Sequence, residues 1–67
     1  ITHTLASVTV VHETAAEADA WATALSVLGP DEGLALAREL DLAAYFLVRT
    51  QQGFETRTTA AFDALQH

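Results

Sequence analysis

The spacing of apolar side chains changes from strand-like to helical in the first half of the chain. Residues 4–12 are rich in β-branched side chains, which is typical of a strand. From residue 15 to residue 28 the apolar side chains recur at helical spacing and form one stripe: Ala18, Trp21, Ala22, Leu25 and Leu28. Further apolar residues extend around the same segment at Ala20, Ala24 and Val27, so we expect this helix to be mostly buried.

The ends of this helix carry recognisable signals. Thr14 and Glu17 fit a capping box, in which the hydroxyl accepts from a first-turn amide and the carboxylate returns to the Thr14 amide. Gly29 suits a left-handed C-terminal cap, and Pro30 suits the first turn of a following helix. The pattern therefore predicts a second helix, which ends near residue 40 and has Leu34, Ala37 and Leu40 on one side.

The second half of the chain indicates a hairpin and a short helix. Residues 43–49 form a continuous apolar run that ends in an arginine, which predicts a buried strand. Residues 51–53 predict a turn, and residues 54–58 alternate as a returning strand. Residues 59–66 predict a final helix whose inward side chains are Ala61, Phe62 and Leu65. The order β-α-α-β-β-α indicates an α+β fold.

Length and composition suggest that this unit does not stand alone. With 67 residues the chain makes at most one small domain, and it has no cysteine that could staple it. Hydrophobic residues make up 51%, which is high for so small a domain. The chain begins at Ile1 and contains no methionine. We therefore expect a fragment, or one chain of a cleaved protein, whose apolar faces pack on further structure.

The net charge restricts the partners. Nine acidic and three basic residues give a net charge of −6 at pH 7. Binding to nucleic acid or to an anionic membrane needs clustered lysine and arginine, so the charge argues against both. It is compatible with a divalent cation.

Asp19 is the residue most in need of an explanation. It lies past the first turn of an apolar helix, and no lysine or arginine is three or four residues away. A buried carboxylate without a partner is very costly, so Asp19 either faces water or meets a cation. Thr23 lies four residues later, on the same side of the helix. A carboxylate and a hydroxyl are the hard oxygen donors that Mg²⁺ takes, with waters and phosphates as its other ligands.

This spacing also has simpler interpretations. Asp19 could be solvated at the edge of the helix, with the Thr23 hydroxyl bonded back to a backbone carbonyl. Trp21 could stack on a flavin or adenine ring, although its place on the apolar stripe favours a core role. The histidines do not suggest a metal site, because His3 and His12 are an odd number of residues apart and fall on opposite faces of one strand.

A longer resemblance favours the metal site. The runs Ala-Ser-Val-Thr-Val-Val, Ala-Asp-Ala-Trp-Ala-Thr-Ala-Leu, Val-Leu-Gly-Pro and Leu-Ala-Ala-Tyr-Phe-Leu-Val-Arg follow one another along nearly the whole chain. In this order they resemble the C-terminal region of the FAD:protein FMN transferases, the ApbE-like family. Residues 1–67 are then the C-terminal β-α-α-β-β-α portion of a larger flavin-transferase domain. The family's upstream His-x-x-Asp-Pro-x-Thr-Gly stretch is not in this sequence.

The resemblance implies a reaction and a site. It assigns Mg²⁺ binding beside the FAD pyrophosphate to Asp19 and Thr23, with Asp19 also the catalytic candidate. The implied reaction transfers FMN from FAD to a Thr or Ser hydroxyl of a target protein and releases AMP. The implied partners are the N-terminal remainder of the polypeptide and the flavin-accepting target. The implied location is the periplasm, or the inner membrane through a lipid anchor.

Two alternatives remain open at this point. A relative could keep Asp19 and Thr23 but bind FAD without transfer, or hydrolyse it to FMN and AMP. The second alternative is a small α+β interaction module without chemistry. Such a module would gain no thermal stability from FAD or Mg²⁺.

Overall fold

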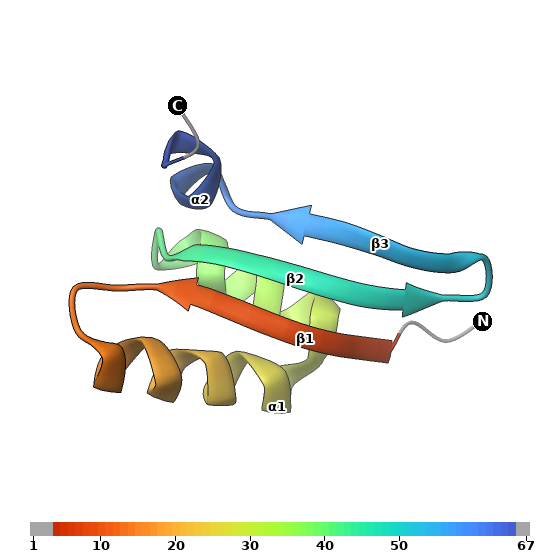
Figure 1. Ribbon diagram of the computed structural model, residues 1–67, viewed down its shortest axis with the longest axis horizontal. Helices are drawn as coiled ribbons and strands as arrows, with labels where there is room; N and C mark the ends of the chain where they lie inside the picture. Colours follow the sequence, from red (N-terminus) through yellow and green to blue (C-terminus); the bar gives the residue numbers. More distant parts are fainter. Residues whose placement is uncertain (1–3, 66–67) are drawn as a thin grey trace.

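The computed structural model describes residues 4–65, which form one three-stranded antiparallel sheet and two helices. The elements are β1 (Thr4–Val11), α1 (Ala15–Glu39), β2 (Ala43–Thr50), β3 (Gly53–Thr58) and α2 (Ala60–Ala64), as Figure 1 shows. Their order confirms the predicted α+β fold and places each predicted strand within one or two residues of its expected limits. His3 and His67 lie outside the described residues.

The sheet has strand order β1-β2-β3, with the central strand between its two sequence neighbours. Val10 pairs with Ala44 and Val8 with Phe46 across β1 and β2, while Phe46 pairs with Arg57 across β2 and β3. The register shifts between Leu5 and Ser7, so β1 carries a bulge near its start. This register fixes which side chains share a face of the sheet, because alternate residues point to opposite sides.

The helix α1 consists of two helical halves joined at a kink. Gly29 leaves the helical conformation with φ 88° and ψ 176°, and Pro30 follows it as the first residue of the second half. Only glycine adopts this positive φ without strain. The predicted stop and restart at Gly29 and Pro30 is therefore confirmed. The first half runs alongside β1, and the second half crosses behind the sheet (Figure 1).

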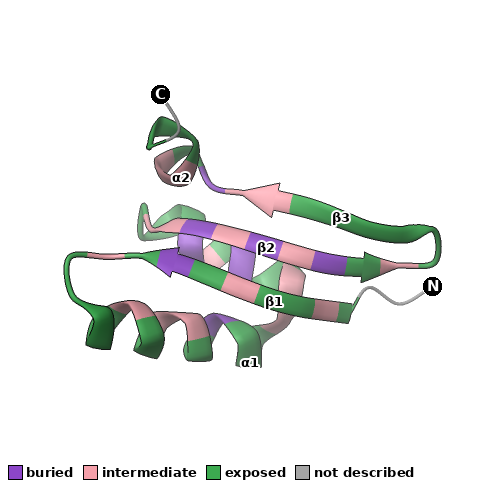
Figure 2. Cartoon of the chain, viewed as in Figure 1, coloured by how far each residue is buried: buried purple, intermediate pink, exposed green. Residues whose placement is uncertain are grey.

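The core lies between the sheet and α1. Its buried side chains come from β1, α1 and β2, and they are Val10, Leu25, Leu34, Ala37, Ala44, Phe46 and Val48. Figure 2 shows that the buried positions alternate along β2. Trp21 and Ala22 are half-buried and pack against this cluster, which supports the core interpretation of Trp21. Alternate residues of β2 thus form the apolar surface against which the second half of α1 packs.

Three expectations about burial are wrong. The first half of α1 is not mostly buried, because Ala20 and Ala24 are exposed and Val27 is 82% exposed. Leu40 lies at the end of α1 and Leu65 follows α2, and both are largely exposed instead of facing the core. The sheet is narrow and α1 is bent, so only one stripe of each helical half reaches the core. The remaining apolar surface has no cover among residues 4–65.

Both helix starts are capped by threonine. The Thr14 hydroxyl accepts from the Glu17 amide at 3.1 Å, as the predicted capping box requires. The Glu17 carboxylate, however, lies 3.1 Å from His12 Nδ1. The contact lacks hydrogen-bond geometry, so it is an ion pair only when His12 is protonated. At α2, Thr59 accepts from the Phe62 amide at 3.3 Å.

The second half of α1 ends in a Schellman motif. The Leu42 amide donates to the Ala37 carbonyl at 2.8 Å, and the Asp41 amide donates to the Arg38 carbonyl at 3.2 Å. Asp41 occupies the left-handed position with φ 57°, where glycine is the usual residue. This cap turns the chain directly into β2.

Candidate metal site on the first half of the long helix

Asp19 and Thr23 lie on the outer side of α1, one turn apart and away from the core. Both residues are exposed, whereas Trp21, Ala22 and Leu25 face the sheet. The helix is regular between positions 19 and 23, so the two side chains project in nearly the same direction. The structure therefore places both predicted ligands on one accessible surface.

The hydroxyl of Thr23 is oriented by the helix itself. Its Oγ1 donates to the Asp19 carbonyl at 3.0 Å. Because the hydroxyl proton is used in this bond, the oxygen lone pairs remain available to a cation. The same bond is also what a simple surface threonine makes, as anticipated above. The bond is compatible with metal binding, because it leaves the Thr23 oxygen lone pairs accessible.

The Asp19 carboxylate has no protein counter-charge within residues 4–65. No hydrogen bond or ion pair engages its oxygens in this part of the chain. Its exposure removes the argument that burial demands a cation, since water can solvate the charge. The carboxylate is nevertheless free to bind an ion without first breaking another contact.

The described residues hold no preformed metal centre with three or more histidine or acidic ligands. Asp19 and Thr23 together offer two oxygen donors. Mg²⁺ is usually bound by one or two carboxylates, with phosphates and waters as its remaining ligands. The donor set therefore fits a Mg²⁺ ion that is shared with a nucleotide, and it does not fit a metal site built by this segment alone.

The surface around the two ligands is nearly free of charge. Ala20, Ala24 and Val27 lie on the adjoining part of the helix and are all exposed. A solvent-facing helix normally carries charged and polar side chains on this side. A hollow of about 430 Å³ lies elsewhere, between the end of β1 and α2, and neither Asp19 nor Thr23 lines it.

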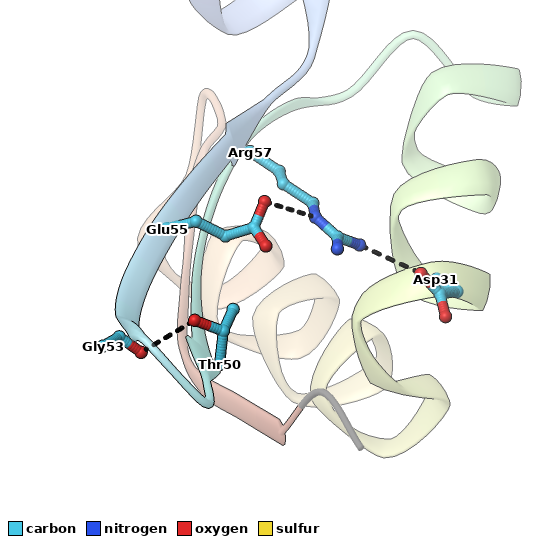
Figure 3. A network of polar contacts seen from close by, with 5 residues as sticks. All are labelled: Asp31, Thr50, Gly53, Glu55 and Arg57. Carbon is cyan, nitrogen blue, oxygen red and sulfur yellow. Dashed lines mark hydrogen bonds and ion pairs between the residues drawn. The ribbon is translucent and has the colours of Figure 1, made fainter. Parts of the chain in front are cut away.

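A polar network on another side of the molecule joins β3 to the second half of α1 (Figure 3). Arg57 donates through Nη1 to Asp31 Oδ1 at 2.9 Å, and its Nε lies 3.6 Å from a Glu55 oxygen. The hydrogen bond that Arg57 donates to the Asp31 carboxylate raises the pKa of Arg57 above its ordinary value, with partial burial opposing and Glu55 adding to the effect. We interpret this network as structural, because the Arg57 guanidinium is paired with two carboxylates of the protein, Asp31 and Glu55.

The comparison with protein families decides the assignment. The model of the ApbE family matches residues 1–46. The chain belongs to the ApbE family. Asp19 and Thr23 both lie within the matched residues.

Proteins similar to this chain carry one function in their names. The FAD:protein FMN transferase of Klebsiella pneumoniae (strain 342) is 48% identical over 62 residues, which are 92% of this chain and 18% of that protein. The one from Haemophilus influenzae is 45% identical over 65 residues, which are 97% of this chain and 19% of that protein. The chain thus spans about a fifth of the length of the relatives it matches.

The fold is also found in solved structures of the family. The apo crystal structure of Pseudomonas stutzeri flavinyl transferase ApbE aligns with a TM-score of 0.90 at 54% identity, over 97% of this chain and 21% of that one. The flavin transferase ApbE from Vibrio cholerae aligns with a TM-score of 0.88 at 31% identity. The sheet and helices described here are therefore shared with known flavin transferases.

Sequence reasoning missed two features that shape this unit. Thr59 is 2% exposed and links three segments, although the sequence suggested only the start of a short helix. The sequence analysis assigns no role to Arg57, yet this residue ties β3 to α1 through Asp31. The alternation of residues 54–58 puts Arg57 on the opposite face from the apolar Phe54, which would predict a solvent-facing arginine. No local signal therefore indicates that Arg57 turns toward α1 and meets Asp31.

Proposed function

We propose that this chain is the Mg²⁺-binding part of an enzyme that transfers FMN from FAD to a threonine or serine hydroxyl of a target protein and releases AMP. Residues 1–67 form part of one transferase domain in this proposal. Asp19 and Thr23 are its metal ligands, and Asp19 is the residue on which the reaction depends most. Membership of the ApbE family carries the proposal, because the relatives are named for the transfer of FMN from FAD to a protein.

The geometry supports this role in two ways. The Asp19 carboxylate is accessible and free of other contacts within residues 4–65, and Thr23 presents a second oxygen one turn away. Two donors leave most of the coordination shell to other groups, as expected for an ion shared with phosphates.

Each residue would then have a distinct part. A bound Mg²⁺ ion supplies Lewis-acid neutralisation of charge on the phosphate oxygens. Asp19 holds the ion through a full negative charge, and Thr23 fixes its position through a neutral oxygen. Loss of the charged ligand should therefore be more damaging than loss of the neutral one.

The rest of the site belongs, in this proposal, to the N-terminal remainder of the same polypeptide, which would supply the flavin-binding groups and the other ligands. The flavin-accepting protein is the second partner. A periplasmic or membrane-anchored location remains a proposal from family resemblance. Among the described residues, neither helix has the length and apolar character needed to cross a bilayer.

The test compares Asp19→Asn with the wild type in the complete protein. FAD, limiting Mg²⁺ and a target protein are supplied, and AMP release and covalent flavin on the target are measured. We expect Asp19→Asn to abolish transfer while the fold is retained, because an exposed substitution usually changes stability by less than about 0.5 kcal/mol. Thr23→Val should weaken metal binding less severely.

Glu32→Gln is the matched control, since it neutralises another exposed acid on the same helix. It should leave transfer unchanged. Full activity of Asp19→Asn at limiting Mg²⁺ would contradict the site. AMP release without a flavin-labelled target would indicate an FAD-hydrolysing relative, and the absence of any Mg²⁺ or FAD effect on thermal stability would favour an interaction module.

A further inference from the structure

The face of the sheet that points away from α1 has no covering layer within residues 4–65. We call it the open sheet face, and its central positions are Ser7, Thr9, Tyr45, Leu47, Phe54 and Thr56. In Figure 1 the second half of α1 lies behind the sheet and no element crosses in front of it. Among the residues that the structure describes, α2 covers part of this face, and its Phe62 ring lies 5.6 Å from that of Tyr45.

The charges on β3 are on the opposite side from the one expected for a solvent-facing sheet. Arg57 and Glu55 pair with Phe46 and Val48, so both charged residues point to the side that α1 covers. Phe54 and Thr56 point to the open sheet face, where Phe54 is 58% exposed. A half-solvated antiparallel sheet normally places apolar residues toward the helix and charges toward water.

The whole open sheet face follows the same pattern. Its strand positions include no aspartate or glutamate, although the chain has nine acids. Its single charged residue is Arg49, whose guanidinium lies 5.1 Å from the centre of the Phe54 ring. A face composed of Val, Leu, aromatic, Ser and Thr side chains is suited to packing against another layer of protein.

We propose that the open sheet face is an interior surface of the complete transferase, covered by an apolar layer from the remainder of the same polypeptide. This inference rests on the proposed function, because it takes the chain to be part of the longer enzyme. Domains are built from packed layers, and here one layer, α1, is already in place on one side. The other layer comes from the four-fifths of the relatives' length that lies outside the matched region.

The shared fold supports this occupant over a second copy of the chain. The unit aligns over 97% of its length with a solved transferase in which it makes up 21% of the chain. When this unit is part of a much longer polypeptide, the rest of that polypeptide is the closest apolar surface that can pack on the open sheet face. The covering layer is therefore intramolecular, and its presence does not depend on protein concentration.

The test measures thiol accessibility on both sides of the sheet in the complete protein. Ser7 and Thr56 both pair with Leu47, one from each neighbouring strand, so Ser7→Cys and Thr56→Cys probe the centre of the open sheet face. Both changes are small, and both sites are exposed within the described chain. Glu55→Cys is the matched control, because it is adjacent to Thr56 but faces the other side and is 45% exposed.

We expect a maleimide reagent to label Ser7→Cys and Thr56→Cys at least roughly tenfold more slowly than Glu55→Cys, since a covered site must open before it reacts. All three thiols should react at equal rates in denaturant. Equal labelling of the three native variants would overturn the inference. Protection that disappears on dilution to the monomer would also overturn it, because the cover would then be a second copy.

The labelling result is independent of the transfer assay. A protein that transfers FMN but labels freely at Ser7→Cys and Thr56→Cys contradicts this inference alone. A protein that protects both thiols but transfers no FMN supports the covered face and contradicts the proposed function.

Discussion

The Thr59 side chain connects three segments through one hydroxyl group. Its Oγ1 donates to the Leu42 carbonyl at 2.6 Å and accepts from the Ala44 amide at 3.0 Å, while also capping α2. The residue is almost fully buried. A buried amide left without a partner costs free energy, so this hydroxyl stabilises both the start of β2 and the position of α2.

Thr59→Val should destabilise the protein by about 1–3 kcal/mol, because it keeps the shape but leaves the Ala44 amide unsatisfied. Thr59→Ser keeps the hydroxyl and should lose much less. The free energies of unfolding of both variants can be compared by urea denaturation. A valine variant as stable as the serine variant would contradict this account of Thr59.

At the scale of elements, the two halves of α1 approach each other closely at Gly33. A Cβ atom added to Gly33 would lie 2.8 Å from the Leu25 carbonyl oxygen and 3.2 Å from Phe46 Cε2. The Leu25 backbone cannot move away without shifting the first half of α1. Glycine at this position therefore permits the bent helix to pack on itself and on β2.

Gly33→Ala separates helix propensity from packing. Propensity alone favours alanine in a helix by about 1 kcal/mol. Because the added methyl meets backbone, we expect a net loss of about 1–3 kcal/mol in the free energy of unfolding. Glu32→Ala, at the adjacent exposed position, is the control and should be nearly neutral. A more stable Gly33→Ala variant would show that the two halves of α1 can separate at little cost.

The sequence predicts the elements well and their packing less well. Helical spacing around Leu25, and the Gly29 and Pro30 signals, define the two halves of α1 because these are local properties of the chain. The exposure of Val27 and Leu65 was not predictable, since it depends on how much of each helix a narrow sheet can cover. The contact at Gly33 depends on the kink angle, which no local pattern specifies.

In the candidate site, too, the sequence predicts what depends on local spacing and does not predict what depends on tertiary contacts. Asp19 and Thr23 share a helix face by spacing alone, and the structure confirms that placement. Their partners could not be found from this sequence, because the described residues supply no further acidic or histidine ligand for a complete centre. The metal role stays a prediction that family membership supports.

At the scale of the whole molecule, two uncovered surfaces carry few charges. One is the outer side of α1 around Asp19, Thr23 and Val27, and the other is the open sheet face on the far side from the second half of α1. The acids of this chain lie mostly on neither surface, although its net charge is −6. Both surfaces are suited to contacts with the remainder of the proposed transferase, in which Asp19 is the proposed charged ligand of the metal ion.

The structure of the complete protein with FAD and Mg²⁺ bound tests this claim most directly. We predict that an Asp19 carboxylate oxygen lies about 2.0–2.1 Å from the ion, with Thr23 Oγ1 and a phosphate oxygen of FAD also in its shell. A Mg²⁺ ion held on the FAD phosphates by other residues, with Asp19 pointing into bulk solvent, would contradict the account.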